Sequence, residues 1–251
     1  MAKQYQCVFF IAIFIGLLLA SQAGAYTDPI DGSLLNLSLT GWRLDSGGPC
    51  DESWNGVSCS GSSVIYLKLH GLNLSGYITA GLYNLYNLQQ LDISSNSIGG
   101  EIPYVLPPNA THISMACNFF TQNIALSLHG MKSNVFTGLQ NLREMDLSYN
   151  NFTGDLPPSF GSLTNLTGLY LQNNQLTGSV AYLAELPLTH LNLSHNLLSG
   201  PIGNGFTDVQ NLRELDLSYN NFTGDVPTSF RSLTNLTGSI ASLAELPPTD
   251  M

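Results

Sequence analysis

One motif recurs through this chain at nearly constant spacing. Its clearest copy, residues 142–157, has leucine or methionine at positions 142, 145 and 147, an asparagine at 150 and a glycine at 154. The copies centre on asparagines separated by 22, 32, 24, 22 and 24 residues, namely Asn96, Asn118, Asn150, Asn174, Asn196 and Asn220. A degenerate earlier copy has Leu72 in the asparagine position. One such unit cannot bury its own apolar side, so the copies must stack on one another.

The apolar residues within each copy alternate, as at Met145 and Leu147, and this pattern predicts a short strand with one buried face. A spacing of roughly 20–29 residues is typical of the leucine-rich-repeat class, in which each repeat adds one coil. We therefore predict an α/β fold, a leucine-rich-repeat solenoid that winds as a right-handed superhelix. Short parallel strands should line its concave side, and turns or 3-10 helices its convex side.

The recurring asparagine is the polar exception among inward-facing apolar residues. A buried amide needs hydrogen-bond partners, and stacked asparagines can find them on the backbone of the neighbouring coil. We therefore predict a structural ladder made of Asn96, Asn118, Asn150, Asn174, Asn196 and Asn220.

Residues 1–25 have the features of a secretory signal peptide. Lys3 gives a basic start, an apolar run extends from Cys7 to Ala20, and Ala23-Gly-Ala25 matches a cleavage site. The apolar run is short for a membrane span, which needs about 20 residues. We expect cleavage, with an uncleaved signal anchor as the alternative. No longer apolar run follows, so the mature chain is expected to be extracellular, secreted or at the cell surface, and without a transmembrane span.

Residues 26–60 are predicted to cap the first coil, because an open solenoid exposes an apolar edge there. Residues 61–251 are predicted to form the solenoid, with about seven repeats of which the last is truncated. The cap contains Trp42 and Trp54, whose rings can pack beside its two cysteines.

The cysteines of this chain can form disulfides, because secretion exposes a protein to an oxidising environment. Cys50 and Cys59 lie close together in the cap, and we predict that they form a disulfide. Cys117 is then left over at the edge of the core. We expect a free, mostly buried thiol there, with intermolecular pairing as the alternative.

The cap and the glycine turns together resemble a known family. The matching segments are Tyr26-Thr-Asp-Pro-Ile-Asp31, Leu39-Thr-Gly-Trp42, Gly48-Pro-Cys50, Trp54-Asn-Gly-Val-Ser-Cys59 and Gly61-Ser-Ser-Val64. They are similar to the ectodomain of the STRUBBELIG-receptor family of plant leucine-rich-repeat receptor-like kinases. The resemblance implies a cell-surface recognition role for an extracellular repeat domain, which in the family is joined to a membrane span and a kinase-like domain. This chain matches the ectodomain only.

Two sections of the chain, residues 135–154 and 205–224, are near copies at an offset of 70 residues. They share surface positions as well as the repeat consensus, which indicates a recent duplication. A repeat is missing before the first copy, and ten residues are missing after the second, so the last coil lacks its strand and its asparagine. An open last coil favours association, and we expect the mature chain to self-associate or to need a partner.

Composition and motifs exclude several functions. The formal net charge is −10, without a basic stripe, which argues against nucleic acid as a partner. His190 and His195 lack a third metal ligand, and Asp146 and Asp216 lie about three coils apart, too far for paired acid–base chemistry. No nucleophile, phosphate-binding or kinase motif is present. We predict no enzyme activity, no cofactor and no metal.

Recognition remains, and strand residues between the leucines are the candidates because they face solvent on the concave side. Tyr170 is the best aromatic anchor among them. The full set is His112, Ser114, Glu144, Asp146, Tyr170, Gln172, His190, Asn192, Glu214 and Asp216. The expected partner is a peptide or protein ligand, which includes another receptor ectodomain.

Eight Asn-x-Ser/Thr sequons also mark an extracellular chain. A glycan on Asn192 would obstruct the concave strands, so we exclude that sequon. The predicted glycosylation sites are Asn36, Asn73, Asn109, Asn151, Asn165, Asn221 and Asn235.

The sequence therefore predicts a non-catalytic extracellular recognition module of the receptor-like type. Two alternatives remain. The chain could be a secreted inhibitor of a foreign hydrolase, or a remnant of a rearranged receptor-kinase gene without retained activity.

Overall fold

The computed structural model describes residues 38–40, 48–51, 54–103, 105–121, 123–124, 138–183, 185–202 and 211–224. Several predicted features lie outside these residues. They are the signal peptide at 1–25, Trp42, the sequons at Asn36 and Asn235, and the truncated coil beyond residue 224.

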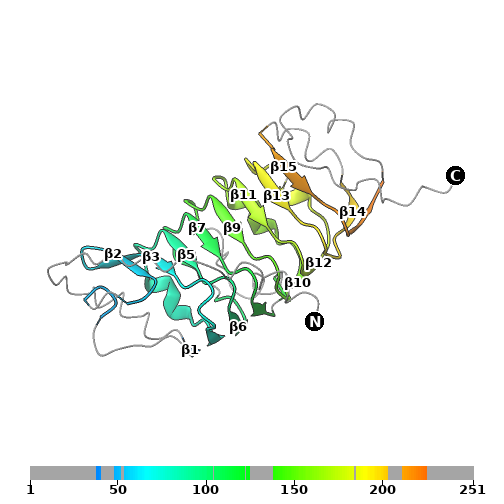
Figure 1. Cartoon of the computed structure of the whole chain (residues 1–251). Coiled ribbons are helices and arrows are strands. Elements are labelled where there is room, and N and C mark those ends of the chain that lie inside the picture. Colours follow the sequence, from blue (N-terminus) through cyan, green and yellow to red (C-terminus); the bar gives the residue numbers. More distant parts are fainter. Residues whose placement is uncertain are drawn as a thin grey trace.

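The described coils stack into a solenoid whose main sheet follows the length of the molecule (Figure 1). Its strands run in spatial order from β15 to β2, and every neighbouring pair is parallel except β2 with β3. The strands are β2 (Val57–Ser60), β3 (Ser63–Lys68), β5 (Gln90–Asp92), β7 (His112–Ser114), β9 (Glu144–Asp146), β11 (Gly168–Tyr170), β13 (His190–Asn192) and β15 (Glu214–Asp216). The predicted solenoid with short parallel strands is confirmed.

A second set of strands was not predicted, and all but the first two follow the ladder asparagine of their coil. β1 (Ser38–Thr40), β4 (Ser75–Tyr77), β6 (Ser97–Gly100) and β8 (Phe119–Phe120) form one sheet, in which β1 is antiparallel to β4. Two parallel pairs continue along the solenoid, β10 (Thr153–Asp155) with β12 (Gln175–Thr177) and β14 (Ser199–Pro201) with β16 (Asn221–Thr223). Apolar alternation gives no signal for such strands, because β4, β10 and β14 contain no buried residue.

The other regular elements among the described residues are short 3-10 helices, which the repeat class predicts for the convex side. They are η2 (Ala80–Asn84), η4 (Pro158–Ser162) and η5 (Ala181–Leu183). Each turns one apolar side chain inward, namely Leu82, Phe160 and Leu183.

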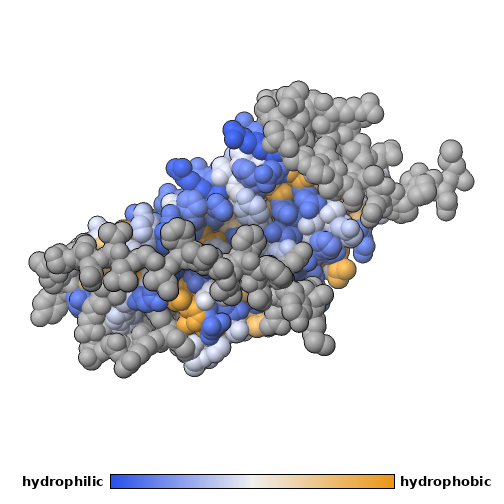
Figure 2. All heavy atoms as spheres, in the orientation of Figure 1, coloured by the Kyte–Doolittle hydropathy of each residue, from blue (hydrophilic) through white to orange (hydrophobic). Residues whose placement is uncertain are grey.

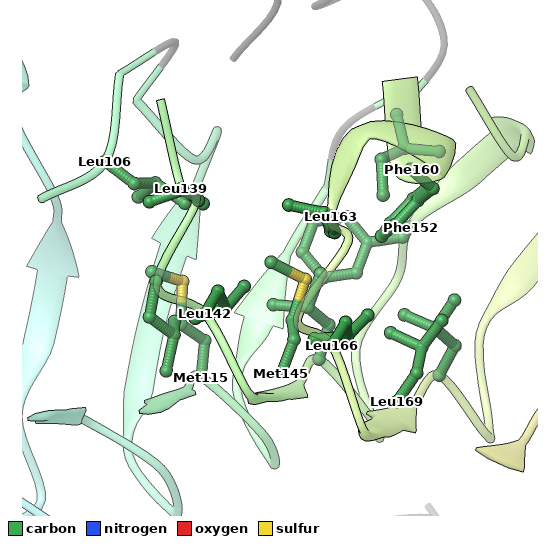
Figure 3. Packing of buried hydrophobic residues seen from close by; sticks show 14 of the residues in the cluster. Leu106, Met115, Leu139, Leu142, Met145, Phe152, Phe160, Leu163, Leu166 and Leu169 are labelled. Atoms are coloured by element: carbon green, nitrogen blue, oxygen red, sulfur yellow. The ribbon is translucent and has the colours of Figure 1, made fainter. Parts of the chain in front are cut away.

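A continuous core fills the coils between these elements. Leucine-slot residues such as Met145, Leu166 and Leu169 are at most 1% exposed, and burial of each such side chain stabilises the fold by roughly 1.5–3 kcal/mol. Figure 3 shows Met145, Leu166 and Phe152 together in this core. The rings of Phe120 and Phe152 stack from successive coils, with centroids 6.2 Å apart. The core therefore joins each coil to the next one.

The N-terminal end is closed by elements from the segment predicted as a cap. β2 adds an antiparallel strand to β3 at the edge of the main sheet, and Trp54 is buried beside it. Cys50 and Cys59 form a disulfide, as predicted, and both pack against the core.

The asparagines of the ladder lie inside the solenoid and bond two coils at once. In Asn150, Nδ2 donates to the carbonyl of Met115 in the preceding coil and to its own coil at Leu147, while Oδ1 accepts from the amide of Phe120. The same pattern is repeated for the other members, Asn96, Asn118, Asn174, Asn196 and Asn220. This network holds adjacent coils together and so fixes the backbone positions of the surface residues in the main sheet.

Candidate recognition surface

The register of the main sheet aligns its solvent-facing residues in two columns. The first column holds the residue that precedes the central leucine-slot position of each strand, namely Tyr66, Gln90, His112, Glu144, Gly168, His190 and Glu214. The second column holds the residue that follows that position, namely Lys68, Asp92, Ser114, Asp146, Tyr170, Asn192 and Asp216.

Apart from Gly168, which is buried, the two columns are accessible although the residues between them are buried. Leu169 and Leu191, at the intervening position, are at most 1% exposed. Tyr170 and Asn192 beside them are half-buried, and Glu144 is exposed. The sheet therefore presents polar and aromatic side chains to solvent, and the buried residues between them anchor its strands in the core.

Serines two residues further along orient the carboxylates of the second column. The amide of Ser148 donates to Oδ1 of Asp146 at 3.0 Å, and the amide and hydroxyl of Ser218 donate to Oδ1 of Asp216 at 3.0 and 2.7 Å. Asn192 accepts the same two bonds from Ser194 through its amide oxygen. An Asp or an Asn can therefore fill this position with the same local structure.

Histidines of the first column are held by the preceding threonine. Nδ1 of His112 lies 2.8 Å from the hydroxyl of Thr111, and Nδ1 of His190 lies 2.9 Å from that of Thr189. These contacts orient both imidazole rings on the sheet.

Tyr170 occupies the space that Gly168 leaves in the first column. A Cβ on Gly168 would stand 3.4 Å from Cε2 of Tyr170 and 3.3 Å from Cγ of Glu144. The tyrosine ring thus covers the glycine, which is buried, and lies beside a glutamate.

Burial and neighbouring charge shift two ionisable groups here. Burial raises the pKa of Asp146, the hydrogen bonds from Ser148 oppose this shift, and the charges of Glu144 and Asp92 add to it. The pKa of Tyr170 is also raised, first by burial and then by the charges of Glu144, Glu214 and Asp146. Acidic side chains of neighbouring strands thus act on both groups, although burial is the larger cause of each shift.

Sequence reasoning overlooked further residues on the same surface. Tyr66, Lys68, Gln90 and Asp92 continue the columns on β3 and β5, and the repeat spacing could have identified them. Nζ of Lys68 lies 5.0 Å from the centroid of the Tyr66 ring. Gln172, which was predicted, is half-buried, and its Oε1 accepts no hydrogen bond among the described residues.

A third row was also overlooked. The residue directly before each ladder asparagine has a positive φ of 54–58°, and we call this row the left-handed column. The backbone turns there to place the asparagine inside. Its members are Ser95, Cys117, Tyr149, Asn173, His195 and Tyr219. The rings of His195 and Tyr219 stack with centroids 4.1 Å apart, and Tyr219 is 60% exposed. The sequence could have identified these residues, because each directly precedes a ladder asparagine.

The prediction of a free Cys117 is wrong. Cys117 is disulfide-bonded, and no cysteine among the described residues is free. The side chain is half-buried, because the left-handed column turns outward from the core. It is therefore accessible for pairing, whereas the sequence position beside Asn118 indicated burial.

The sequons differ in exposure. Asn73, Asn109, Asn165 and Asn221 are exposed, whereas Asn151 is half-buried. Two exposed side chains already bond the preceding coil, since Nδ2 of Asn109 donates to the carbonyl of Tyr86 and that of Asn165 to the carbonyl of Gln140. Glycosylation of either residue would replace that contact.

The part of the chain that the structure describes has neither a metal site nor a membrane-spanning helix. No three histidine, cysteine or acidic side chains gather there as a metal site would require. The same residues contain no helix with the length and apolarity of a membrane span. The visible described surface is mostly hydrophilic, with a few separate hydrophobic residues (Figure 2).

Comparison with known families agrees with the repeat geometry. A leucine-rich-repeat family model matches residues 126–176 and 187–238, and a second leucine-rich-repeat model matches residues 87–108. The chain is a leucine-rich-repeat protein.

Relatives of this leucine-rich-repeat protein include Protein STRUBBELIG-RECEPTOR FAMILY 2 of Arabidopsis thaliana. The two are 48% identical over 83% of the present chain. The predicted resemblance to STRUBBELIG receptors is thereby confirmed. The leucine-rich-repeat protein spans only 32% of the length of that relative.

Solved structures show which ectodomains share the fold. One is the LRR ectodomain of the plant membrane receptor kinase GASSHO1/SCHENGEN3 from Arabidopsis thaliana in complex with CASPARIAN STRIP INTEGRITY FACTOR 2. It matches with a TM-score of 0.61 and 28% identity, over 84% of this chain and 28% of the other. Another is the plant peptide hormone receptor RGFR1 in complex with RGF2. It matches with a TM-score of 0.59 and 27% identity, over 65% of this chain and 26% of the other.

Proposed function

We propose that this leucine-rich-repeat protein is a non-catalytic recognition module that binds a peptide or protein ligand across the two columns of its main sheet. The observation that carries the proposal is the alignment of polar and aromatic side chains over adjacent parallel strands, above a fully buried core. Extended surfaces of this kind are what solenoids use for binding.

The comparisons support a ligand of this class. Both matched ectodomains were solved in complexes, one with RGF2 and the other with CASPARIAN STRIP INTEGRITY FACTOR 2. The leucine-rich-repeat fold is typically a binding module, and its function lies in surface residues rather than in the fold.

The proposal includes an extracellular location. Residues 1–25 would direct secretion, residues 26–60 would cap the solenoid, and residues 61–251 would form it. Exposed sequons such as Asn73 and Asn221 would carry glycans away from the columns.

The proposal is tested with an unbiased library of displayed peptides, panned against the secreted full chain. We expect enriched peptides that bind this chain but bind a Tyr170→Ala variant about tenfold more weakly, because aromatic residues dominate binding hot spots. Tyr182→Ala is the matched control, since Tyr182 is 47% exposed on η5, outside the sheet.

Two results would reject the proposal. One is a library that yields no binding peptide. The other is a set of peptides whose affinity falls equally in the Tyr170 and Tyr182 variants.

A further inference from the structure

Two strands of the main sheet carry the same acidic pair. β9 presents Glu144 in the first column and Asp146 in the second, and β15 presents Glu214 and Asp216 in the same columns. We call these the first and the second acidic pair. They stand at equivalent places in the duplicated sections of the sequence, so the duplication copied a surface as well as a coil.

The sheet fixes the separation of the two pairs. β11 and β13 lie between β9 and β15, which makes three steps from one pair to the other (Figure 1). Neighbouring strands are about 4.8 Å apart, so the pairs are separated by roughly 14 Å.

The carboxylates of both pairs are open to a cation. Glu144 and Glu214 are exposed, and Asp146 and Asp216 are half-buried beside them, where each accepts the serine bonds through Oδ1. No lysine or arginine of the described chain forms an ion pair with any of the four. Arg143 and Arg213, which directly precede the glutamates, are exposed outside both columns.

Tyr170 lies between the two pairs, on β11. One glutamate of each pair acts electrostatically on its hydroxyl. Burial raises the pKa of Tyr170 most, and the charges of Glu144 and Glu214 raise it further. Its ring offers an aromatic surface over Gly168 on which an aliphatic chain or a cation can pack.

We infer that the two acidic pairs together bind one extended peptide segment that carries two basic side chains four residues apart, with the residues between them crossing Tyr170 and Asn192. The inference rests on the proposed function and names its ligand class. An extended chain advances about 3.4 Å per residue, so four residues span roughly 14 Å, which equals the separation of the pairs. Side chains at that spacing also point to the same side of an extended strand.

The lysine of the main sheet restricts where such a peptide can lie. Lys68 stands in the second column on β3, three strands from β9 on the side away from β15. A basic peptide is repelled there and attracted between β9 and β15. Charge therefore selects one end of the sheet.

The test uses fluorescein-labelled peptides in which two arginines are separated by three serines. Comparison peptides have one or seven intervening serines. Binding to the full chain is measured by fluorescence anisotropy. The three-serine peptide should bind about tenfold more tightly than the comparison peptides, since only it places both arginines at the pairs.

Variants of each pair test the assignment separately. Glu144→Gln with Asp146→Asn, or Glu214→Gln with Asp216→Asn, should weaken binding of the three-serine peptide about tenfold. The local structure should persist, because Asn192 already makes the serine bonds that these asparagines need. Asp155→Asn is the matched control, since Asp155 is an exposed carboxylate that accepts a bond from Thr177 but lies on β10, outside the main sheet.

The outcomes separate this inference from the proposed function. Equal affinity for all spacings, or equal loss in the Asp155 control, overturns the paired-site inference. If the displayed library instead yields peptides that need Tyr170 but lack a basic pair, the inference fails and the proposed function stands. If no library peptide binds, both fail.

Discussion

The ring of Tyr170 covers Gly168, two residues earlier on the same strand of the main sheet. A Cβ on the glycine would stand 3.4 Å from Cε2 of the tyrosine and 3.8 Å from its hydroxyl oxygen. The φ of Gly168 is not positive, so the backbone does not require glycine here. What matters is the absence of a Cβ, which leaves room for the neighbouring side chains. Gly168 therefore sets the position of the aromatic group that β11 contributes to the recognition surface.

Gly168→Ala should displace the Tyr170 ring while leaving the fold intact. The added methyl group also meets Cγ of Glu144 at 3.3 Å, so the glutamate must shift slightly and the tyrosine ring is left at the edge of ordinary contact. We expect about threefold weaker binding of the three-serine peptide. The melting temperature should stay equal or rise, since alanine is favoured over glycine within a strand.

In the control Gly99→Ala, on β6, the Cβ makes only ordinary contacts and binding should not change. Unchanged binding in both variants would contradict this role of Gly168.

Asn150→Ala should lower the free energy of unfolding by about 3 kcal/mol, because it leaves buried backbone groups without partners. Nδ2 of Asn150 bonds three carbonyls, and Oδ1 accepts from the amide of Phe120. Asn220 makes the same kinds of bond but is partly exposed, so water can replace them, and Asn220→Ala should cost about 1 kcal/mol. Urea denaturation measures both values. Equal losses would show that burial does not set the cost.

Replacement of both cap cysteines by serine should lower stability by about 2.5 kcal/mol, because the disulfide restricts the unfolded chain. Cys50 and Cys59 are separated by 9 residues, so the closed loop is short. Thermal or urea unfolding of the double variant gives the measurement, with Ser60→Ala on exposed β2 as the control. A double variant as stable as the parent would contradict a stabilising role of this disulfide.

Asp146→Asn should raise stability at neutral pH. Burial raises the pKa of this carboxyl in the folded protein above the ordinary value of 3.8, so the folded state binds the proton more tightly than the unfolded state. The charged form is therefore the less stable one, and the penalty is present above the raised pKa and lost as the pH falls to 3.8 and below.

Melting temperatures measured from pH 3 to pH 8 test this pH dependence of Asp146. The variant should melt higher than the parent at pH 7, and the two curves should converge near the acid end. A gain that is independent of pH would show that the charge is not its cause. The same variant should bind the basic peptide less well, so stability and binding should change in opposite directions.

The sequence predicted the buried half of this molecule well. Leucine-slot positions such as Leu169 and Leu191 repeat with a fixed period, and burial follows from that period alone. The inward asparagines followed from the same spacing. The strands of β10 and β14 gave no such signal, because backbone bonds between coils define them and their side chains do not alternate between core and solvent.

The candidate surface was predicted in part, as a set of positions without its arrangement. Tyr170 and Asp146 were identified as solvent-facing residues, but Tyr149 and Tyr219 were overlooked because their outward direction depends on a positive φ. Cys117 was misassigned for the same reason, since its neighbour Asn118 points inward while its own side chain does not.

The sequence alone determined the repeat, the core positions and the duplicated acidic residues, because each is a matter of residue type and spacing along the chain. The tertiary structure decided which of these residues stand side by side. Glu144 and Glu214 are far apart in sequence and three strands apart in the sheet, with Tyr170 between them. That distance exists only once backbone bonds between coils have fixed the register, and it is the distance that gives the two acidic pairs a common ligand.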